Sequence, residues 1–153
     1  MEKQSTQEIK ERVQDKIEEI EEFLSFLLEI TPKSFEDYKT DLKAKAACER
    51  YAEKIIEAIV DLAFLTAKFL NIEIPAQISD KEIFDLLSNK KIISSMLSSN
   101  LQHAKGMRNI IEHEYGKLND ERVYEALSTE LESDVNEFLA NIKNSLDNKN
   151  KEK

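Results

Sequence analysis

The stretch YAEKIIEAIVDLAFLTAKFL, residues 51–70, decides the fold of this 153-residue chain. Its apolar side chains recur at three- and four-residue steps, which is the spacing of an α-helix. They form two neighbouring stripes, one of Tyr51, Ile55, Ile59, Leu62 and Phe69 and the other of Ala52, Ile56, Val60, Ala63 and Ala67. A helix with so wide an apolar face packs against other elements on two sides. We therefore expect one helix from about residue 34 to residue 70 at the centre of the core.

The segments that flank this helix predict two more helices. Residues 9–27 carry apolar side chains at helical spacing, and the helix they form should end near Pro32, since proline disfavours helical geometry in the residue before it. A loop over residues 71–77 follows the central helix. The sequence SDKE at residues 79–82 then matches a capping box, which predicts a short helix that ends near Asn89.

The C-terminal half of the chain predicts two further long helices. The first runs from Lys91 to Tyr115, where Gly116 supplies a stop, and the second begins at Asn119. The second helix carries one long apolar stripe, made of Val123, Leu127, Leu131, Val135, Phe138, Ile142 and Leu146. Residues 148–153 should form a frayed tail. The sequence thus predicts an all-α fold over residues 1–153, a single antiparallel bundle of four long helices and one short helix.

Composition narrows the possible classes of protein. The 2 Gly and 2 Pro offer too little turn chemistry for an all-β fold, and the 41% hydrophobic content excludes wholesale disorder. The single cysteine, Cys48, excludes an internal disulfide framework and a four-cysteine zinc site. The formal net charge of -9 disfavours nucleic-acid binding by broad phosphate neutralisation. Any contact with nucleic acid is therefore expected to be local.

Neither membrane insertion nor secretion is predicted. The longest strongly apolar run, residues 62–67, is closed by Asp61 and Lys68 and is far shorter than the roughly 20 residues that span a bilayer. The first eight residues, MEKQSTQE, are polar and lead into a charged periodic segment instead of the apolar core of a signal peptide. These features indicate a cytoplasmic protein.

A metal or nucleotide cofactor is not expected. Glu49, Glu53, Glu57 and Asp61 lie at four-residue spacing, but neither histidine has the Glu three positions before it that a di-iron bundle needs, so this row is interpreted as a solvated or ion-paired face. Cys48, in an alanine-rich part of a helix, is interpreted as a small core residue. The two glycines cannot build a phosphate-binding loop.

The chemistry concentrates instead in KGMRNIIEHEY, residues 105–115. Histidine suits proton transfer near neutral pH, and the planar fork of arginine suits a phosphate. On a straight helix, however, Arg108 and His113 point about 140° apart. A twofold dimer would overcome this difficulty, because it places two copies of the motif across a shared cleft. Two His113 and two Arg108 would then supply a base, an acid and a cation for metal-free RNA cleavage.

The same stretch resembles the signature of HEPN-domain toxins of the HepT type, an arginine, four residues, a histidine, one residue and a tyrosine, with a polar residue after the arginine. Arg108, His113 and Tyr115 fill the three fixed places, and Asn109 fills the polar one. The sequence LNDERVY at residues 118–124 also resembles the start of the last helix in that family. The likeness extends from about residue 34 to residue 138.

This resemblance implies an all-helical homodimer that acts as the toxin of a toxin-antitoxin pair and cuts RNA without a metal. It assigns Arg108 and His113 as catalytic residues in a composite cleft, with Asn109 in support. It also implies a nucleotidyltransferase antitoxin, which in several family members transfers adenylate from ATP to the motif tyrosine, here Tyr115. Two other hypotheses stay open: a non-catalytic helical partner of a nucleotidyltransferase, and a purely structural helical dimer.

Overall fold

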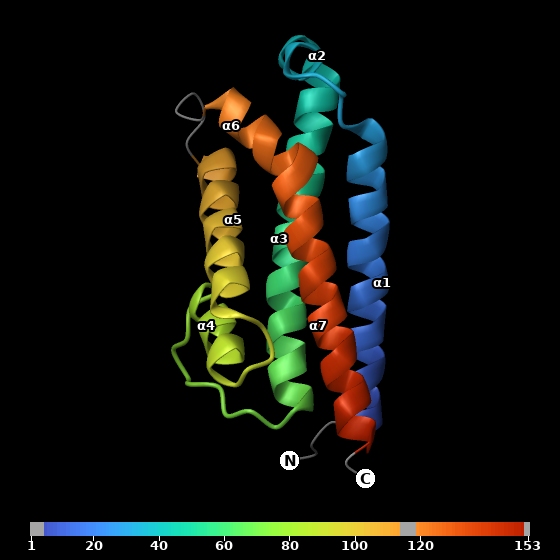
Figure 1. Ribbon diagram of the computed structural model, residues 1–153, viewed down its shortest axis with the longest axis vertical. Helices are drawn as coiled ribbons and strands as arrows, with labels where there is room; N and C mark the ends of the chain where they lie inside the picture. Colours follow the sequence, from blue (N-terminus) through green and yellow to red (C-terminus); the bar gives the residue numbers. More distant parts are fainter. Residues whose placement is uncertain (1–4, 114–118, 152–153) are drawn as a thin grey trace.

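The computed structural model describes residues 5–113 and 119–151, and no strand occurs among them. The elements in chain order are α1 (Thr6–Ile30), α2 (Phe35–Thr40), α3 (Leu42–Phe69), α4 (Glu82–Asn89), α5 (Ser95–His113), α6 (Asp120–Glu125), a π turn (Ala126–Glu130) and α7 (Leu131–Lys151). The long helices α1, α3, α5 and α7 run alternately up and down, and short α4 lies beside the first half of α5 (Figure 1). The predicted all-α antiparallel bundle is confirmed.

Helix α3 forms the centre of the core, as its two stripes predict. Every member of the two stripes is buried except Tyr51, which is half-buried. Helix α1 packs along one side of α3, and α4 and α5 pack on another. Exposed positions such as Glu57 and Asp61 occupy the remaining face. The core therefore extends around α3 in two directions.

The central helix differs from the prediction at its start, because Asp41 divides it into α2 and α3. Asp41 has an extended backbone (φ -87°, ψ 90°), and its carboxylate accepts a hydrogen bond from the backbone N–H of Ala44. Asp41 is thus the N-cap of α3, and its side chain satisfies a donor that an uninterrupted helix would have bonded to the backbone. The predicted single helix from residue 34 to residue 70 is wrong at this one residue.

Serine hydroxyls bind backbone N–H groups close to the starts of α4 and α5. The hydroxyl of Ser79 accepts a hydrogen bond from the N–H of Glu82 at 3.1 Å, which is one of the two bonds of the predicted capping box, whereas the N-cap of α4 itself is Lys81. The hydroxyl of Ser94 accepts from the N–H of Leu97 at 3.0 Å, so α5 begins at Ser95 and not at the predicted Lys91. Lys91 itself has a positive φ of 61°, a backbone conformation that is incompatible with a helix and separates α4 from α5.

The last helix contains a π turn that the sequence analysis did not predict. The N–H of Leu131 bonds to the carbonyl of Ala126, five residues back. In a regular α-helix a four-residue step overshoots a full turn by about 40°, so the steps from Val123 to Leu127, Leu131 and Val135 would drift away from the core. A π turn takes more residues per turn and absorbs this drift. All four side chains are consequently buried.

The sequence predicts fraying from residue 148, whereas α7 continues to Lys151. The ammonium of Lys149 donates a hydrogen bond to the backbone carbonyl of Phe69 and lies 4.3 Å from the centroid of its ring. This contact satisfies a carbonyl at the C-terminal end of α3 and keeps the end of α7 in place.

Among the described residues, no helix is long and apolar enough to cross a bilayer.

The role of Asp41 gives a first prediction. Asp41→Ala should lower the free energy of unfolding by about 1 kcal/mol, because the N–H of Ala44 loses its acceptor. Asp41→Asn should be close to the wild type, since asparagine caps helices equally well. Urea denaturation followed by circular dichroism measures both values. Equal stability of the alanine and asparagine variants would contradict the capping role.

Candidate functional site

The predicted site residues lie at the end of α5. Arg108, Asn109 and His113 fall in the last six residues of this helix, whose backbone is described through His113. Tyr115 lies outside the described residues, and so do the side chains of the other three. The structure describes the residues around this segment, including the side chain of Met107, which directly precedes Arg108.

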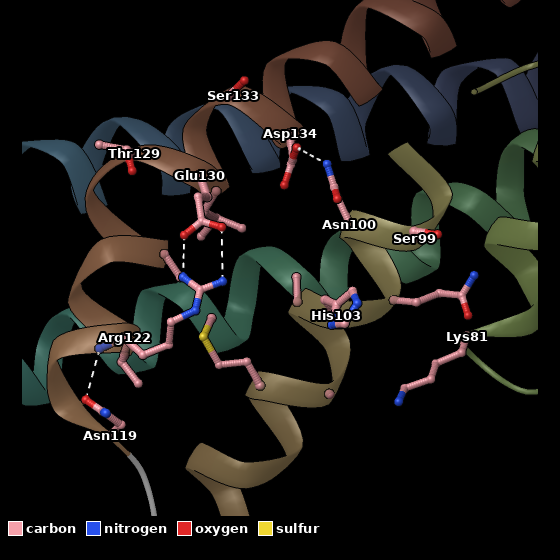
Figure 2. Close-up of a pocket in the computed structure, with 17 residues that line it drawn as sticks. Lys81, Ser99, Asn100, His103, Asn119, Arg122, Thr129, Glu130, Ser133 and Asp134 are labelled. Carbon is pink, nitrogen blue, oxygen red and sulfur yellow. Dashed lines mark hydrogen bonds and ion pairs between the residues drawn. The ribbon is translucent and has the colours of Figure 1, made fainter. Parts of the chain in front are cut away.

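A groove of about 1200 Å³ lies between α5 and the wall formed by α6, the π turn and α7. On α5 its described lining ends at Met107, directly before Arg108, and on the other wall it begins at Asn119. Amide and hydroxyl side chains are frequent in the lining, which includes Ser99, Asn100, Gln102, Asn119, Thr129 and Ser133. The described groove thus runs along α5 as far as the residue before Arg108, and Figure 2 shows the side chains that line it.

Arg122 and Glu130 form an ion pair in this groove. One guanidinium nitrogen of Arg122 donates to Glu130 Oε1 at 3.1 Å, and the other donates to Oε2. The two hydrogen bonds span the π turn, as Figure 2 shows. The hydrogen bonds from Arg122, together with its charge, lower the pKa of Glu130. Glu130 is therefore ionised at neutral pH, and its charge is opposed by Arg122.

Asn100 and Asp134 form the second polar contact across the groove. The amide of Asn100 donates to Asp134 Oδ1 at 3.2 Å and links α5 to α7 (Figure 2). Burial raises the pKa of Asp134, and nearby acids add to this effect, whereas the hydrogen bond from Asn100 opposes it. The groove thus holds two acidic side chains, each engaged by a donor.

Three lysines precede the predicted site in the sequence, Lys90, Lys91 and Lys105. The side chain of Lys105 is only 11% exposed and pairs with Asp80 at 3.2 Å. Lys90 and Lys91 precede α5, whereas Arg108 lies about 20 Å along the helix from its first residue. None of these three lysines supplies free charge at the predicted site.

Sequence reasoning missed two cations in the groove, Lys81 and Arg122, and took His103 as a surface or boundary residue. His103 is exposed and lines the groove. Arg122 comes from the start of the last helix, and Lys81 comes from the turn before α4. The position of Lys81 follows from how α4 packs against α5, which local sequence patterns do not encode.

Aromatic and charged contacts with residues 32–45 hold α6, which forms part of the groove wall, in place. The hydroxyl of Tyr124 donates to the carbonyl of Pro32 at 2.7 Å, and the rings of Tyr124 and Tyr38 are 5.2 Å apart. Lys45 Nζ lies 3.4 Å from Asp120 at the start of α6. These contacts hold α6, and with it Asn119, against α2 and α3.

The acidic row on α3 is ion-paired, as expected. Glu49 pairs with Lys45 at 3.1 Å, Glu53 with Arg50 at 3.5 Å, and Asp61 with Lys16 at 3.8 Å. Within the described part of the chain, no three His, Cys, Asp or Glu side chains are grouped to hold a metal ion.

Cys48 is fully buried, and its sulfur lies 3.6 Å from the hydroxyl oxygen of Thr31. Burial raises the pKa of its thiol, so it stays protonated as a core residue, which confirms the prediction.

Comparison with known proteins supplies the family. The family model described as "Ribonuclease HepT-like" matches residues 9–142. The chain belongs to the HepT-like ribonuclease family. The resemblance carried by residues 105–115 is thereby confirmed.

Individual relatives agree with this membership. The chain is 30% identical over 106 residues to the mRNA nuclease HepT of Shewanella oneidensis, covering 69% of this chain and 77% of that protein. The solved structure of a tri-AMPylated Shewanella oneidensis HEPN toxin in complex with an MNT antitoxin has a TM-score of 0.77 at 27% identity, covering 86% of this chain and 96% of that one. The cytosolic protein YutE of Bacillus subtilis shares the fold, with a TM-score of 0.74 at 16% identity over 92% of each chain.

The environment of Asp134 generates a prediction for this HepT-like chain. Because burial raises its folded-state pKa above the ordinary 3.8, ionised Asp134 opposes folding at neutral pH. Asp134→Asn removes that charge and should raise the free energy of unfolding at pH 7 by a few tenths of a kcal/mol, about the size expected for a partly solvated charge. The gain should shrink as the pH falls through the raised pKa, because wild-type Asp134 then becomes neutral.

Urea titrations at pH 7 and at about pH 4 measure this difference. Asp147→Asn, on the exposed part of α7, is the matched control and should show no comparable pH-dependent gain. A gain for Asp134→Asn that stays constant with pH would contradict the role of its charge.

Proposed function

We propose that this chain is the toxin of a toxin-antitoxin pair and acts as a metal-independent endoribonuclease, with Arg108 and His113 as its catalytic residues. The observation that carries the proposal is the family match over residues 9–142, which includes the whole Arg108–Tyr115 signature. The groove beside the end of α5 supports it, because the groove gives a strand of RNA a path to that segment.

In the proposed RNA cleavage, His113, Arg108 and Asn109 have separate roles. One His113 takes the proton of the RNA 2′-hydroxyl, whose oxygen then attacks the adjacent phosphorus. A second His113 protonates the leaving 5′-oxygen, and Arg108 stabilises the negative charge on the phosphorane. The products are a 2′,3′-cyclic phosphate and a free 5′-hydroxyl. Asn109, next to Arg108, supports the phosphate through its amide.

Two histidines imply two copies of the chain. Arg108 and His113 are five residues apart in the sequence, and a regular helix separates positions at this spacing by about 140°. A homodimer with twofold symmetry brings Arg108 of one copy near His113 of the other. The active unit that we propose is therefore a homodimer with a composite cleft.

Tyr115 is the proposed site of neutralisation by a nucleotidyltransferase antitoxin. The structural relative from Shewanella oneidensis is tri-AMPylated and in complex with an MNT antitoxin. On this chain the phenol oxygen of Tyr115 would attack the α-phosphorus of ATP, form an ester with AMP, release pyrophosphate and lose its proton to a base of the antitoxin. The added phosphate lies seven residues from Arg108 and repels an RNA phosphate there.

The nuclease proposal predicts RNA cleavage by the purified protein in EDTA. Arg108→Ala and His113→Ala should each lower the rate by at least about 100-fold, the usual contribution of an acid–base or charge-stabilising group. Both variants should stay folded and dimeric by circular dichroism and size exclusion. Arg50→Ala changes an exposed arginine on α3 and should cleave RNA like the wild type.

Cleavage retained in both the Arg108 and the His113 variants would refute the assignment. Growth arrest on inducing the wild type, but not His113→Ala at equal expression, would support toxicity through the same residue. No cleavage and no arrest, with a stable nucleotidyltransferase complex, would instead favour the non-catalytic partner.

The antitoxin proposal predicts a covalent mark on Tyr115. With the nucleotidyltransferase and ATP, the wild type should gain the mass of adenylate on the peptide that contains Tyr115, and Tyr115→Phe should lack this mark. Tyr51→Phe removes a hydroxyl elsewhere in the bundle and should be modified normally. Adenylate on other residues alone, measured by peptide mass spectrometry, would contradict Tyr115 as the target.

A further inference from the structure

Lys81 reaches the groove from a distant part of the sequence. It lies in the turn before α4, is exposed, and extends its side chain toward α5 (Figure 2). Its Nζ lies over Gly106: a Cβ built on this glycine would be 3.5 Å from the ammonium nitrogen. Because Gly106 has no side chain, the ammonium approaches the backbone of α5 closely.

Lys81 meets α5 on the side of the helix that carries the proposed catalytic residue His113. Gly106 and His113 are seven residues apart, which corresponds to about 20° around the helix axis and about 10 Å along it, whereas Gly106 and Arg108 are about 160° apart. Lys81 and Met107 line the same groove. A strand of RNA that reaches His113 along this groove would therefore pass the ammonium of Lys81.

Within the part of the chain whose side chains are described, the charge of Lys81 is not neutralised by an acid. Arg122 is engaged by Glu130, and Lys105 by Asp80. Among the side chains described, in residues 5–107 and 119–149, no carboxylate lies within ion-pair distance of Lys81. Of the lysines and arginines that line this described groove, Lys81 alone has no acidic partner there.

The acids of the groove are engaged as well. Glu130 accepts two hydrogen bonds from Arg122, and Asp134 accepts one from Asn100. Both acids sit on the last helix, across the groove from α5. Their charges are partly compensated, so the Lys81 end of the groove is the more favourable part for a phosphate.

We propose that Lys81 binds a backbone phosphate of the RNA, adjacent to the phosphate that is cleaved. This inference rests on the proposed ribonuclease function. Lysine contributes a compact point charge and not a planar fork, so the contact fixes the position of the strand without selecting a base. Lys81 is accordingly an RNA-binding residue and takes no part in the proton transfers.

The test measures binding of a short, fluorescent 2′-O-methyl RNA by fluorescence anisotropy. This RNA lacks the 2′-hydroxyl nucleophile, so binding is read without cleavage. Lys81→Gln should weaken binding about fivefold at low salt, and between about 50 mM and 200 mM salt the slope of log K against log salt should fall by about 0.7, the value for one lost phosphate contact on a single strand. Lys81→Arg should keep the wild-type slope.

Lys90→Gln is the matched control, since it removes the same charge from an exposed lysine at the other end of α4. It should leave affinity and slope unchanged. On cleavable RNA, Lys81→Gln should raise KM with little change in kcat, because it removes an interaction made equally in the ground and transition states. Thermal melting of each variant verifies that the exposed substitution leaves the fold intact.

The outcomes separate this inference from the proposed function. Wild-type cleavage in EDTA with an unchanged salt slope for Lys81→Gln overturns the role of Lys81 alone. An equal loss of slope in Lys90→Gln also overturns it, because the effect would then be one of net charge. No cleavage by the wild type refutes the nuclease proposal, whereas a slope change specific to Lys81 still supports a phosphate contact.

Discussion

Burial of α3 on two sides is the constraint on which the rest of the molecule depends. Its stripes require α1 on one side and α4 with α5 on another, and each fully buried Leu or Ile contributes about 1.5–3 kcal/mol relative to exposure. Once α5 lies along α3, its C-terminal end arrives beside α6, which Tyr124 holds to Pro32. The groove is the space left between these two elements, so its place follows from the core.

The electrostatics of the groove fit a chain with a net charge of -9. A protein of this charge repels RNA over most of its surface, and it gains affinity only where cations face the strand and acids are occupied. Here the two acids of the described groove lining, Glu130 and Asp134, have partners, and the cations come from α6 and from the turn before α4. Recognition of RNA by such a surface is local, and it is sensitive to single charges.

Much of this arrangement was predictable because helical periodicity is a strong local signal. The buried stripes of α1, α3 and the last helix all follow from three- and four-residue spacing, and the motif on α5 was visible as a sequence pattern. The break at Asp41 does not follow from periodicity, because an aspartate inside a periodic segment fits an exposed helical position as well as an N-cap. The position of Lys81 over Gly106 is not predictable for another reason. It depends on how α4 packs against α5, and the two residues are 25 positions apart in the sequence. The catalytic roles of Arg108 and His113 stay predictions.

The π turn at Ala126–Glu130 divides one continuous helix into two parts with different registers. After it, the apolar side chains of α7 follow the core, whereas before it α6 directs Asn119 and Arg122 toward the groove. Because the turn absorbs rotation between the two parts, a change in how α6 is oriented need not be transmitted to the core side chains of α7. A substitution on the groove side of α6 can thus change the wall of the groove while the bundle keeps its packing. The last helix in this way serves the core and the groove with a single backbone.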